Sequence, residues 1–233
     1  MLTRRNFIMS GISGLALSAC GSQQAVSPVT QPVYLVGGNR YTADATPQPG
    51  VQKRQVQSGE TWKSLFGDRA RLAQHLNRQN TGLRLGQTVL IPDAALTMSD
   101  ISPFATKRQT GAGYRVIFDH NKNAWGLYLN GTLVRWGAAV GGKNTETTRG
   151  EFTISETAGP DRVSNLFPVR SATDRGGAPM PYFMRITSGG IGLHAGEFGG
   201  LHASEGCIRM FYEDAQWLNL NIARQHTVRV TVI

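Results

Sequence analysis

The sequence predicts a mainly β chain, in which a β-sandwich or barrel-like domain with one late helix follows a small β-α-α-β domain. Three observations support this fold class. Short β-rich segments recur from residue 114 to residue 233. One long amphipathic segment, at 212–224, interrupts them near the end. Upstream, 53–92 holds two helical patterns between two short β patterns.

The composition excludes several classes of protein. The chain has 233 residues, of which 40% are hydrophobic and 8% aromatic, so it can bury the cores of one or two domains. Two cysteines are too few for a disulfide framework or a four-cysteine zinc site. The formal net charge of +9 favours an anionic partner.

The first twenty residues have the pattern of an export signal. Two adjacent arginines precede an uncharged stretch at 7–19, which is too short to span a membrane. The sequence Leu-Ser-Ala-Cys-Gly at 17–21 resembles a bacterial lipobox, in which the cysteine is lipidated and the chain is cut before it. We therefore expect 1–19 to be a lipoprotein signal peptide and Cys20 to carry the lipid.

Two alternatives stay open for this segment. It is also compatible with an ordinary signal peptide beside an unmodified cysteine, and the paired arginines resemble a twin-arginine export signal. Removal of 1–19 takes away two positive charges and leaves +7. For an exported, lipid-anchored chain we expect no nucleic-acid partner. We expect it at the periplasmic face of the envelope, at the outer membrane where one is present, because residue 21 is not Asp.

Two polar segments divide the rest of the chain. Residues 20–52 are rich in Gln, Ser, Thr, Pro and Gly and predict a lipidated tether. Residues 93–113 predict a linker between a compact block at 53–92 and a second one at 114–233. Ten Lys or Arg and five Asp or Glu fall in 20–113, so +5 of the +7 lies before the second block.

The elements of the first block follow from local patterns. A β pattern at 54–57 precedes a Ser-Gly-Glu-Thr turn, where Ser58 or Thr61 would cap a helix. Apolar residues recur at helical spacing in two short helices: Trp62, Leu65 and Phe66, then Leu72, Ala73 and Leu76. A strand at 88–92 ends the block at a proline.

This block resembles the LysM family. The matching pieces are Val-Gln-Ser-Gly-Glu-Thr at 56–61, Leu-Asn at 76–77 and Leu-Gly-Gln-Thr-Val-Leu-Ile-Pro at 85–92. The family usually has Asp in place of Glu60 and an aliphatic residue in place of Trp62. The resemblance implies binding to the N-acetylglucosamine backbone of peptidoglycan or chitin; the alternative is a spacer without a ligand.

The second block is expected to be mostly strands. An Asn-Gly pair at 130–131 is a strong hairpin signal. The amphipathic pattern at 212–224 predicts the only strong helix of this block. The expected strands are 114–118, 125–128, 133–139, 151–154, 182–186, 190–193 and 227–233.

Residues that can do chemistry gather at 191–210. Cys207 is the only thiol left if Cys20 is lipidated, and positive neighbours such as His194 and Arg209 would lower its pKa. Glycines let the loop fold back, so that backbone N–H groups can approach a substrate oxygen. On residue types alone, a buried structural cysteine is the alternative.

A metal site in this segment is a weaker alternative. His194, His202, Glu205 and Cys207 are ligand types, but their spacing matches no zinc pattern. We therefore expect no metal and no other cofactor.

The same segment resembles the catalytic motif of the YkuD-type L,D-transpeptidase family. That motif is a His, a glycine-containing loop and then Ser-His-Gly-Cys-(Ile/Val)-Arg-(Met/Leu). His194 stands thirteen residues before Cys207, and Ser204 and 206–210 match. Upstream, 149–154 resembles the family's Thr-Pro-x-Gly-x-Phe strand, and the segment from Pro179 to Met184 resembles the strand before its catalytic His. The resemblance covers 114–233.

The resemblance implies a cysteine acyl-enzyme. Cys207 would be the nucleophile and His194 its general base, with the backbone carbonyl of Ala195 orienting the imidazole. The N–H groups of Gly206 and Cys207 would form the oxyanion hole. The donor would be a peptidoglycan tetrapeptide stem, from which attack at the diamino-acid carbonyl expels D-Ala. An amine acceptor would then give a cross-link or attach a protein to the wall.

Three further residues are candidates for contact with substrate. The planar fork of Arg209 suits a carboxylate. Ser204 would brace the loop or donate a hydrogen bond. Tyr182 lies in the segment that resembles the strand before the catalytic His.

One departure leaves the activity open. The family commonly has His where Glu205 stands, and a carboxylate beside Cys207 would raise the pKa of the thiol. His202, which falls where the family often has Pro, is a candidate to restore the lost positive charge; the alternative is that its side chain faces solvent. The alternatives to a transpeptidase are a hydrolase on the same scaffold, either an L,D-carboxypeptidase or an endopeptidase, and a non-catalytic peptidoglycan-binding tether.

Overall fold

The computed structural model describes residues 51–143, 147–168, 177–200 and 204–233. The predicted signal peptide, Cys20 and nearly all of the predicted tether lie outside the described residues, as does His202. Within the described part of the chain, none of the helices has the length and hydropathy of a bilayer-crossing segment.

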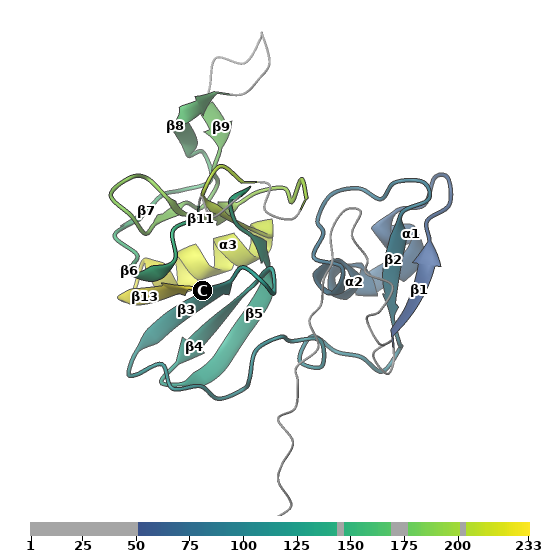
Figure 1. Ribbon diagram of the computed structural model, residues 1–233, viewed down its shortest axis with the longest axis horizontal. Coiled ribbons are helices and arrows are strands. Elements are labelled where there is room, and N and C mark those ends of the chain that lie inside the picture. The colour runs from purple at the N-terminus through teal and green to yellow at the C-terminus, as the bar shows by residue number, and fades with distance from the viewer. Residues whose placement is uncertain (1–50, 144–146, 169–176, 201–203) are drawn as a thin grey trace, which may run out of the picture. The chain divides into compact units, whose positions relative to one another are not determined.

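The first described part, here called the small domain (51–92), has the predicted order β-α-α-β (Figure 1). Its two strands pair antiparallel, with Val51 opposite Pro92. Thr61 caps the first helix: its hydroxyl accepts from the Ser64 N–H, and the Ser64 hydroxyl accepts from the Thr61 N–H. The elements are β1 (Val51–Gln55), α1 (Trp62–Phe66), a 3₁₀ turn (Gly67–Arg69), α2 (Ala70–Leu76) and β2 (Thr88–Pro92).

A compact core holds the small domain together. Val56, Trp62, Ala73 and Val89 are buried against one another. Asn77 ties α2 to β2, because its side-chain amide donates to the Leu90 carbonyl and accepts from the Leu90 N–H, both at 2.8 Å. That this domain belongs to the LysM family stays a prediction.

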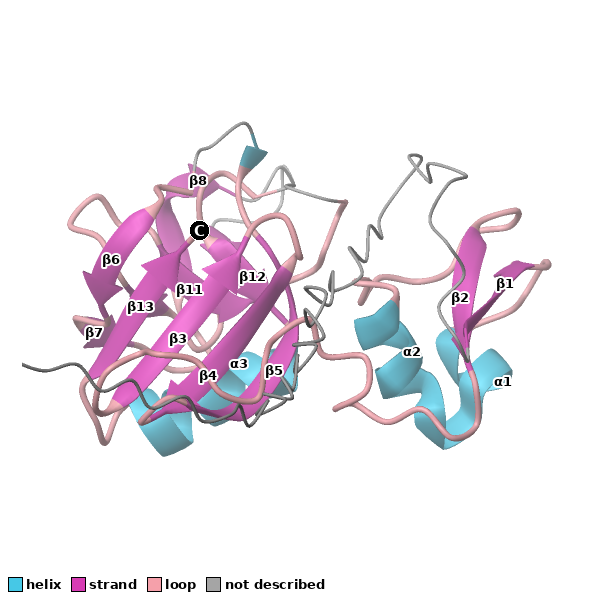
Figure 2. Cartoon of the chain, turned by 60° about the horizontal axis from the view of Figure 1, so that its bottom comes forward, coloured by secondary structure: helices cyan, strands magenta, loops and turns pink. Residues whose placement is uncertain are grey.

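A nine-stranded sheet forms most of the second part, in the order β6-β13-β3-β4-β5-β12-β11-β10-β7 (Figure 2). Two pairs are parallel, β13 with β3 and β11 with β12. Its strands are β3 (Tyr114–Asp119), β4 (Ala124–Leu129), β5 (Thr132–Val140), β6 (Gly150–Thr153), β7 (Glu156–Thr157), β10 (Met184–Arg185), β11 (Gly192–Ala195), β12 (Ile208–Met210) and β13 (Val228–Val232). A separate hairpin consists of β8 (Val163–Pro168) and β9 (Gly177–Pro179).

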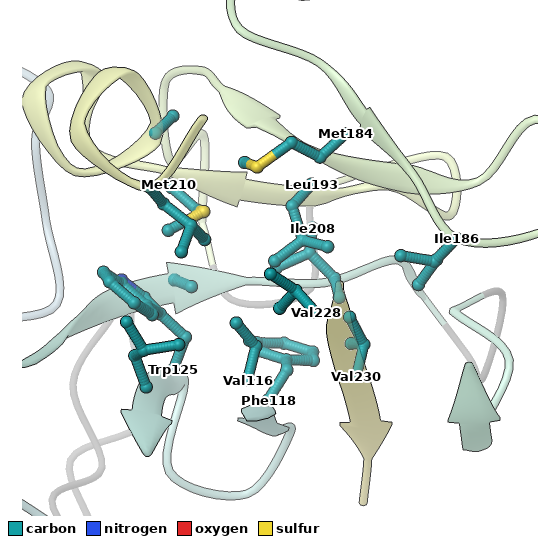
Figure 3. Close-up of a cluster of buried hydrophobic side chains, with 14 of the residues drawn as sticks. Val116, Phe118, Trp125, Met184, Ile186, Leu193, Ile208, Met210, Val228 and Val230 are labelled. Carbon is teal, nitrogen blue, oxygen red and sulfur yellow. The ribbon is translucent and has the colours of Figure 1, made fainter. Parts of the chain in front are cut away.

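The sheet curls so that its two halves share one core. Figure 3 shows side chains of β10, β11 and β12 facing those of β3, β4 and β13, among them Leu193 and Ile208 opposite Val116 and Val230. Helix α3 (Tyr212–Leu218) packs into the same cluster and is followed by a π-helical turn at Asn219–Ala223. This mainly β, half-barrel architecture confirms the predicted fold class.

The structure differs from the prediction in its shortest elements. β7, β8, β9 and β12 were not expected. The predicted strand at 182–186 shrinks to β10, because Tyr182 has a φ of +57°, outside the strand region. The predicted helix at 212–224 is α3 plus the π-helical turn.

The segment predicted as a linker, 93–113, is packed against the sheet. Ile101 and Phe104 are buried in a cluster with Leu76 of α2 and with Tyr128 and Trp136 of the sheet. The Tyr128 hydroxyl also donates to the Ala105 carbonyl at 2.8 Å, and the Trp136 indole N–H donates to the Met98 carbonyl at 2.7 Å. The segment therefore contributes side chains to a core that includes α2 and the strands.

Candidate active site

Two parallel strands, β11 and β12, bring the candidate residues together. Their register places His194 opposite Arg209. Successive strand side chains alternate between faces, and Leu193 and Ile208 point into the core, so His194 and Arg209 point to the opposite face. Cys207 directly precedes β12, two residues before Arg209, so the same alternation carried back one residue beyond the strand puts it on the face of His194 and Arg209.

His194 is buried and its tautomer is fixed. Nδ1 lies 2.7 Å from the Ala195 carbonyl oxygen. Because a carbonyl can only accept, Nδ1 carries the proton and Nε2 keeps a lone pair. Burial lowers the pKa of His194 from 6.5 to about 4; the hydrogen bond to Ala195 opposes this shift, and Arg209 adds to it. The ring is therefore neutral at pH 7, the state that a general base needs.

Cys207 is a protonated thiol at neutral pH. Burial raises its pKa above 9.0, although the backbone N–H of Gly192 and the charges of Arg209 and Arg185 act to lower it. The expectation that positive neighbours leave this thiol with a lowered pKa is therefore wrong in its net effect, because burial outweighs them. The same groups would still stabilise a thiolate as it forms.

The residue before the thiol is fixed by a buried clamp. Gly206 has a φ of +118°, a conformation open to glycine and strained for other residues. The hydroxyl of Thr147 donates to the Gly206 carbonyl at 2.6 Å and accepts from the Gly142 N–H at 2.7 Å. Our sequence reasoning missed Thr147. Its position three residues before Gly150, like the Thr of the Thr-Pro-x-Gly pattern, was the available signal.

The carboxylate of Glu205, which we expected to raise the pKa of the Cys207 thiol, forms an ion pair with another residue. Its carboxylate pairs with the Lys143 ammonium at 3.1 Å and is half-exposed. The charged side chains that act on the pKa of Cys207 are Arg209 and Arg185, and burial is the cause of the rise.

The three residues predicted to contact substrate, Ser204, Arg209 and Tyr182, lie in different surroundings. Ser204 is buried, and its backbone N–H donates to the Gly141 carbonyl at 3.2 Å, which braces the loop before Cys207. Arg209 lies on the face of the thiol and donates to the Glu197 carbonyl at 3.2 Å. Tyr182 is buried in the core cluster, and its hydroxyl accepts from Gln216 of α3 at 2.8 Å. The Tyr182 hydroxyl is therefore engaged with helix α3, and contact of Tyr182 with substrate stays a prediction.

The small domain also contributes to this region. The Asn80 side chain donates to the Gly196 carbonyl at 2.9 Å and accepts from the Phe198 N–H at 2.7 Å. It thus hydrogen-bonds the loop after His194 as a neighbouring strand would. Asn80 and Gly196 also line a cavity of about 430 Å³. No local signal in the sequence pointed to Asn80.

Comparison with family models identifies the chain. Residues 113–232 match the model of YkuD, the L,D-transpeptidase catalytic domain. The match covers just over half of the sequence, and the chain belongs to this family. No curated protein matches it.

A solved structure shows the same fold at low identity. The L,D-transpeptidase (residues 123-326) from Xylanimonas cellulosilytica DSM 15894 is 18% identical, with a TM-score of 0.52, over 81% of this chain and all of that one. An L,D-transpeptidase from Mycobacterium smegmatis is 19% identical, with a TM-score of 0.44, over 64% of this chain. The chain spans 63% of the M. smegmatis structure.

Proposed function

We propose that the chain is a peptidoglycan L,D-transpeptidase that works through an acyl-enzyme on Cys207. The observation that carries the proposal is the arrangement of His194: its Nδ1 donates to Ala195, which leaves a lone pair on Nε2, and its strand β11 pairs with β12, which begins directly after Cys207. Membership of the YkuD family supports the same reading.

The first half-reaction acylates the thiol. The sulfur of Cys207 attacks the carbonyl carbon of the diamino acid in a tetrapeptide stem, while His194 takes the thiol proton. Because the thiol is protonated at neutral pH, this transfer accompanies the attack. The N–H groups of Gly206 and Cys207 stabilise the oxyanion. His194 then protonates the leaving amine, the C–N bond breaks, and D-Ala departs from a thioester.

The second half-reaction transfers the acyl group. An amine acceptor attacks the thioester and gives its proton to His194. The C–S bond breaks, and that proton returns to the sulfur. Arg209 holds a substrate carboxylate near His194. If water takes the place of the amine, the same steps give a free acid, so the acceptor decides between transfer and hydrolysis.

The other parts of the chain would place this chemistry at the cell wall. Cys20 carries the lipid that anchors the protein to the membrane, and the small domain binds the N-acetylglucosamine glycan. Replacing Cys20 with Ala should release the protein from the membrane fraction. Sacculi should retain a chain inactivated at Cys207, and N-acetylglucosamine oligomers should compete with that retention; loss of binding in moderate salt alone would leave only charge attraction.

The decisive experiment is incubation with a disaccharide-tetrapeptide, with and without an amine acceptor, followed by mass analysis. Transpeptidation gives a cross-linked product, release of D-Ala and a thioester on the peptide that contains Cys207. Release of D-Ala with only a free acid would assign a hydrolase. Absence of both products and adduct from a folded chain would leave a non-catalytic tether. Cys207→Ser is the matched control and should form no thioester.

A further inference from the structure

A second arginine lies on the face of Cys207, on the opposite side from Arg209. Arg185 in β10 pairs with Gly192 in β11. Cys207 directly precedes β12, whose first residue, Ile208, pairs with Leu193, and the backbone N–H of Gly192 acts on the Cys207 thiol, so we place Cys207 in the row of Arg185 and Gly192. Residues directly opposite on adjacent strands share a face. Gly192 is buried, and a Cβ there would stand 2.5 Å from the Phe183 ring, so this ring fills the position beside Gly192.

Side-chain contacts hold the guanidinium of Arg185 near the thiol. Its Nε donates to a Glu156 oxygen at 2.6 Å. Its Nη1 lies 3.5 Å from the point where a Cβ on Gly190 would stand, and the Gly190 carbonyl oxygen is 3.9 Å from the sulfur of Cys207. The Arg185 side chain is 25% exposed, so substrate can reach it.

The local charge leaves this side of the site positive. Glu156 is shared by two arginines, because Arg162 also lies 3.7 Å from its second oxygen. Both guanidinium groups lie over the Phe183 ring, at 5.5 Å and 5.6 Å from its centre. Two cations and one carboxylate leave a net charge of +1, so the group is suited to an anion rather than to an amine.

The strand positions of Arg209 and Arg185 indicate which part of the substrate each arginine would contact. The leaving amine must reach His194, and Arg209 stands opposite His194. Arg185 stands instead in the row of Cys207, away from His194. The residue retained in the thioester therefore extends toward Arg185.

We propose that Arg185 binds a carboxylate on the acyl side of the scissile amide, so that the site selects a diamino acid with a free side-chain carboxylate. The inference rests on the proposed function for the identity of the substrate. The anion site itself does not, because it follows from the strand register and the Glu156 contact.

Two alkylating probes test the anion site without any turnover. Iodoacetate and iodoacetamide both form an S–C bond to Cys207 with loss of iodide, but only iodoacetate is anionic. Arg185→Gln should lower the ratio of their rates by about three- to tenfold, the effect of one nearby charge at a partly exposed site. Arg185→Lys should keep most of the ratio, and the exposed Arg84→Gln should leave it unchanged. An unchanged ratio in folded Arg185→Gln would overturn the proposal.

A substrate pair tests the selectivity. Wild type should use a donor with a free side-chain carboxylate in preference to its carboxamide, and Arg185→Gln should lose this preference by slowing only the acid. An equal loss for both donors would make Arg185 a structural residue. If neither donor turns over, the proposed function fails, and the alkylation ratio still decides whether the anion site exists.

Discussion

Two buried histidines of this chain carry their protons on opposite nitrogens. His194 donates from Nδ1 to the Ala195 carbonyl, which leaves a lone pair on Nε2. His75, in α2, accepts at Nδ1 from the Ala138 N–H at 3.0 Å, so its proton is on Nε2. That nitrogen lies 3.7 Å from the carboxylate of Asp214. Similar burial therefore accompanies opposite tautomers.

The surroundings of the two rings explain their different roles. His75 stacks on Phe211, with ring centres 4.3 Å apart, and its bond to Ala138 joins the small domain to β5. Burial, and then Arg71, Arg78 and Arg135, hold its pKa well below 6.5. A lowered pKa thus marks both histidines and does not by itself indicate a base.

The largest effect on the rate of acylation should come from His194→Ala. Loss of the general base should slow acylation of Cys207 by about 10²–10⁴-fold, with little change in stability. Single-turnover kinetics with the tetrapeptide donor measures this rate. The corresponding change His75→Ala should leave the rate per folded molecule within about threefold. Equal losses of rate in both variants would remove the distinction between the two histidines.

His75→Ala should instead cost stability. It leaves the Ala138 N–H buried without its acceptor and opens a gap beside Phe211. We expect a loss of about 2–4 kcal/mol in the free energy of unfolding. Urea denaturation measures it, with the exposed His226→Ala as a control that should change stability by less than about 0.5 kcal/mol. A loss no larger than that of the control would show that His75 does not hold the two parts together.

The pH dependence follows from the same lowered pKa values. Both histidines bind a proton more readily when the chain is unfolded, so stability should fall as pH drops from 6.5 toward 4. His194 alone should contribute up to about 3 kcal/mol over this window. Asp214 opposes the fall at its acid end, because burial raises the pKa of its carboxyl.

Activity per folded molecule should decline only near pH 4, where His194 is protonated in the free enzyme. A pH profile of kcat/KM for the donor, corrected for the folded fraction, provides this measurement. An apparent pKa of 6.5 on the acid side would mean that the imidazole is exposed when it works.

A smaller effect on catalysis is expected from removing the hydrogen bonds of Asn80, which connect the small domain to the loop after His194. Asn80→Ala removes two hydrogen bonds to backbone groups and should lower kcat by about two- to tenfold, with little change in KM. Asn80→Asp keeps the acceptor for Phe198 and should lose less. A change confined to unfolding, without a change in kcat, would show that Asn80 does not position the loop.

The smallest effect is expected at Glu205. Lys143 holds its carboxylate and burial sets the thiol pKa, so Glu205→His should change the rate of adduct formation at Cys207 by less than about twofold. Intact mass against time measures this rate. A large acceleration would restore the interpretation of Glu205 as a suppressor of the thiol.

The parts of the fold that the sequence predicted are those that local patterns determine. β3, β4 and β5 are six or more residues long and contain β-branched or aromatic residues, and an Asn-Gly turn joins the last two. β7 and β10 have only two residues each and exist because distant segments pair with them. No periodicity of two or three residues can reveal such strands.

The residues of the candidate site also divide into those that a local motif indicates and those that only tertiary contacts bring in. Cys207 and His194 are predicted as site residues from a motif within one segment of twenty residues. Asn80 meets Gly196 across 116 positions of sequence, and Arg185 shares a row with Cys207 only through two strand registers. Tyr182 lies outside the expected strand because its φ is positive, and its side chain is part of the core cluster.

The buried cluster around Ile101 and Phe104 bears on how the protein can be divided. The family match begins at residue 113, after both of these side chains. A fragment cut there would uncover Tyr128 and Trp136, which are buried in the full chain. An exposed aromatic surface of this kind promotes self-association. The residues that define the family thus depend on Ile101 and Phe104 to keep two of their aromatic side chains out of water.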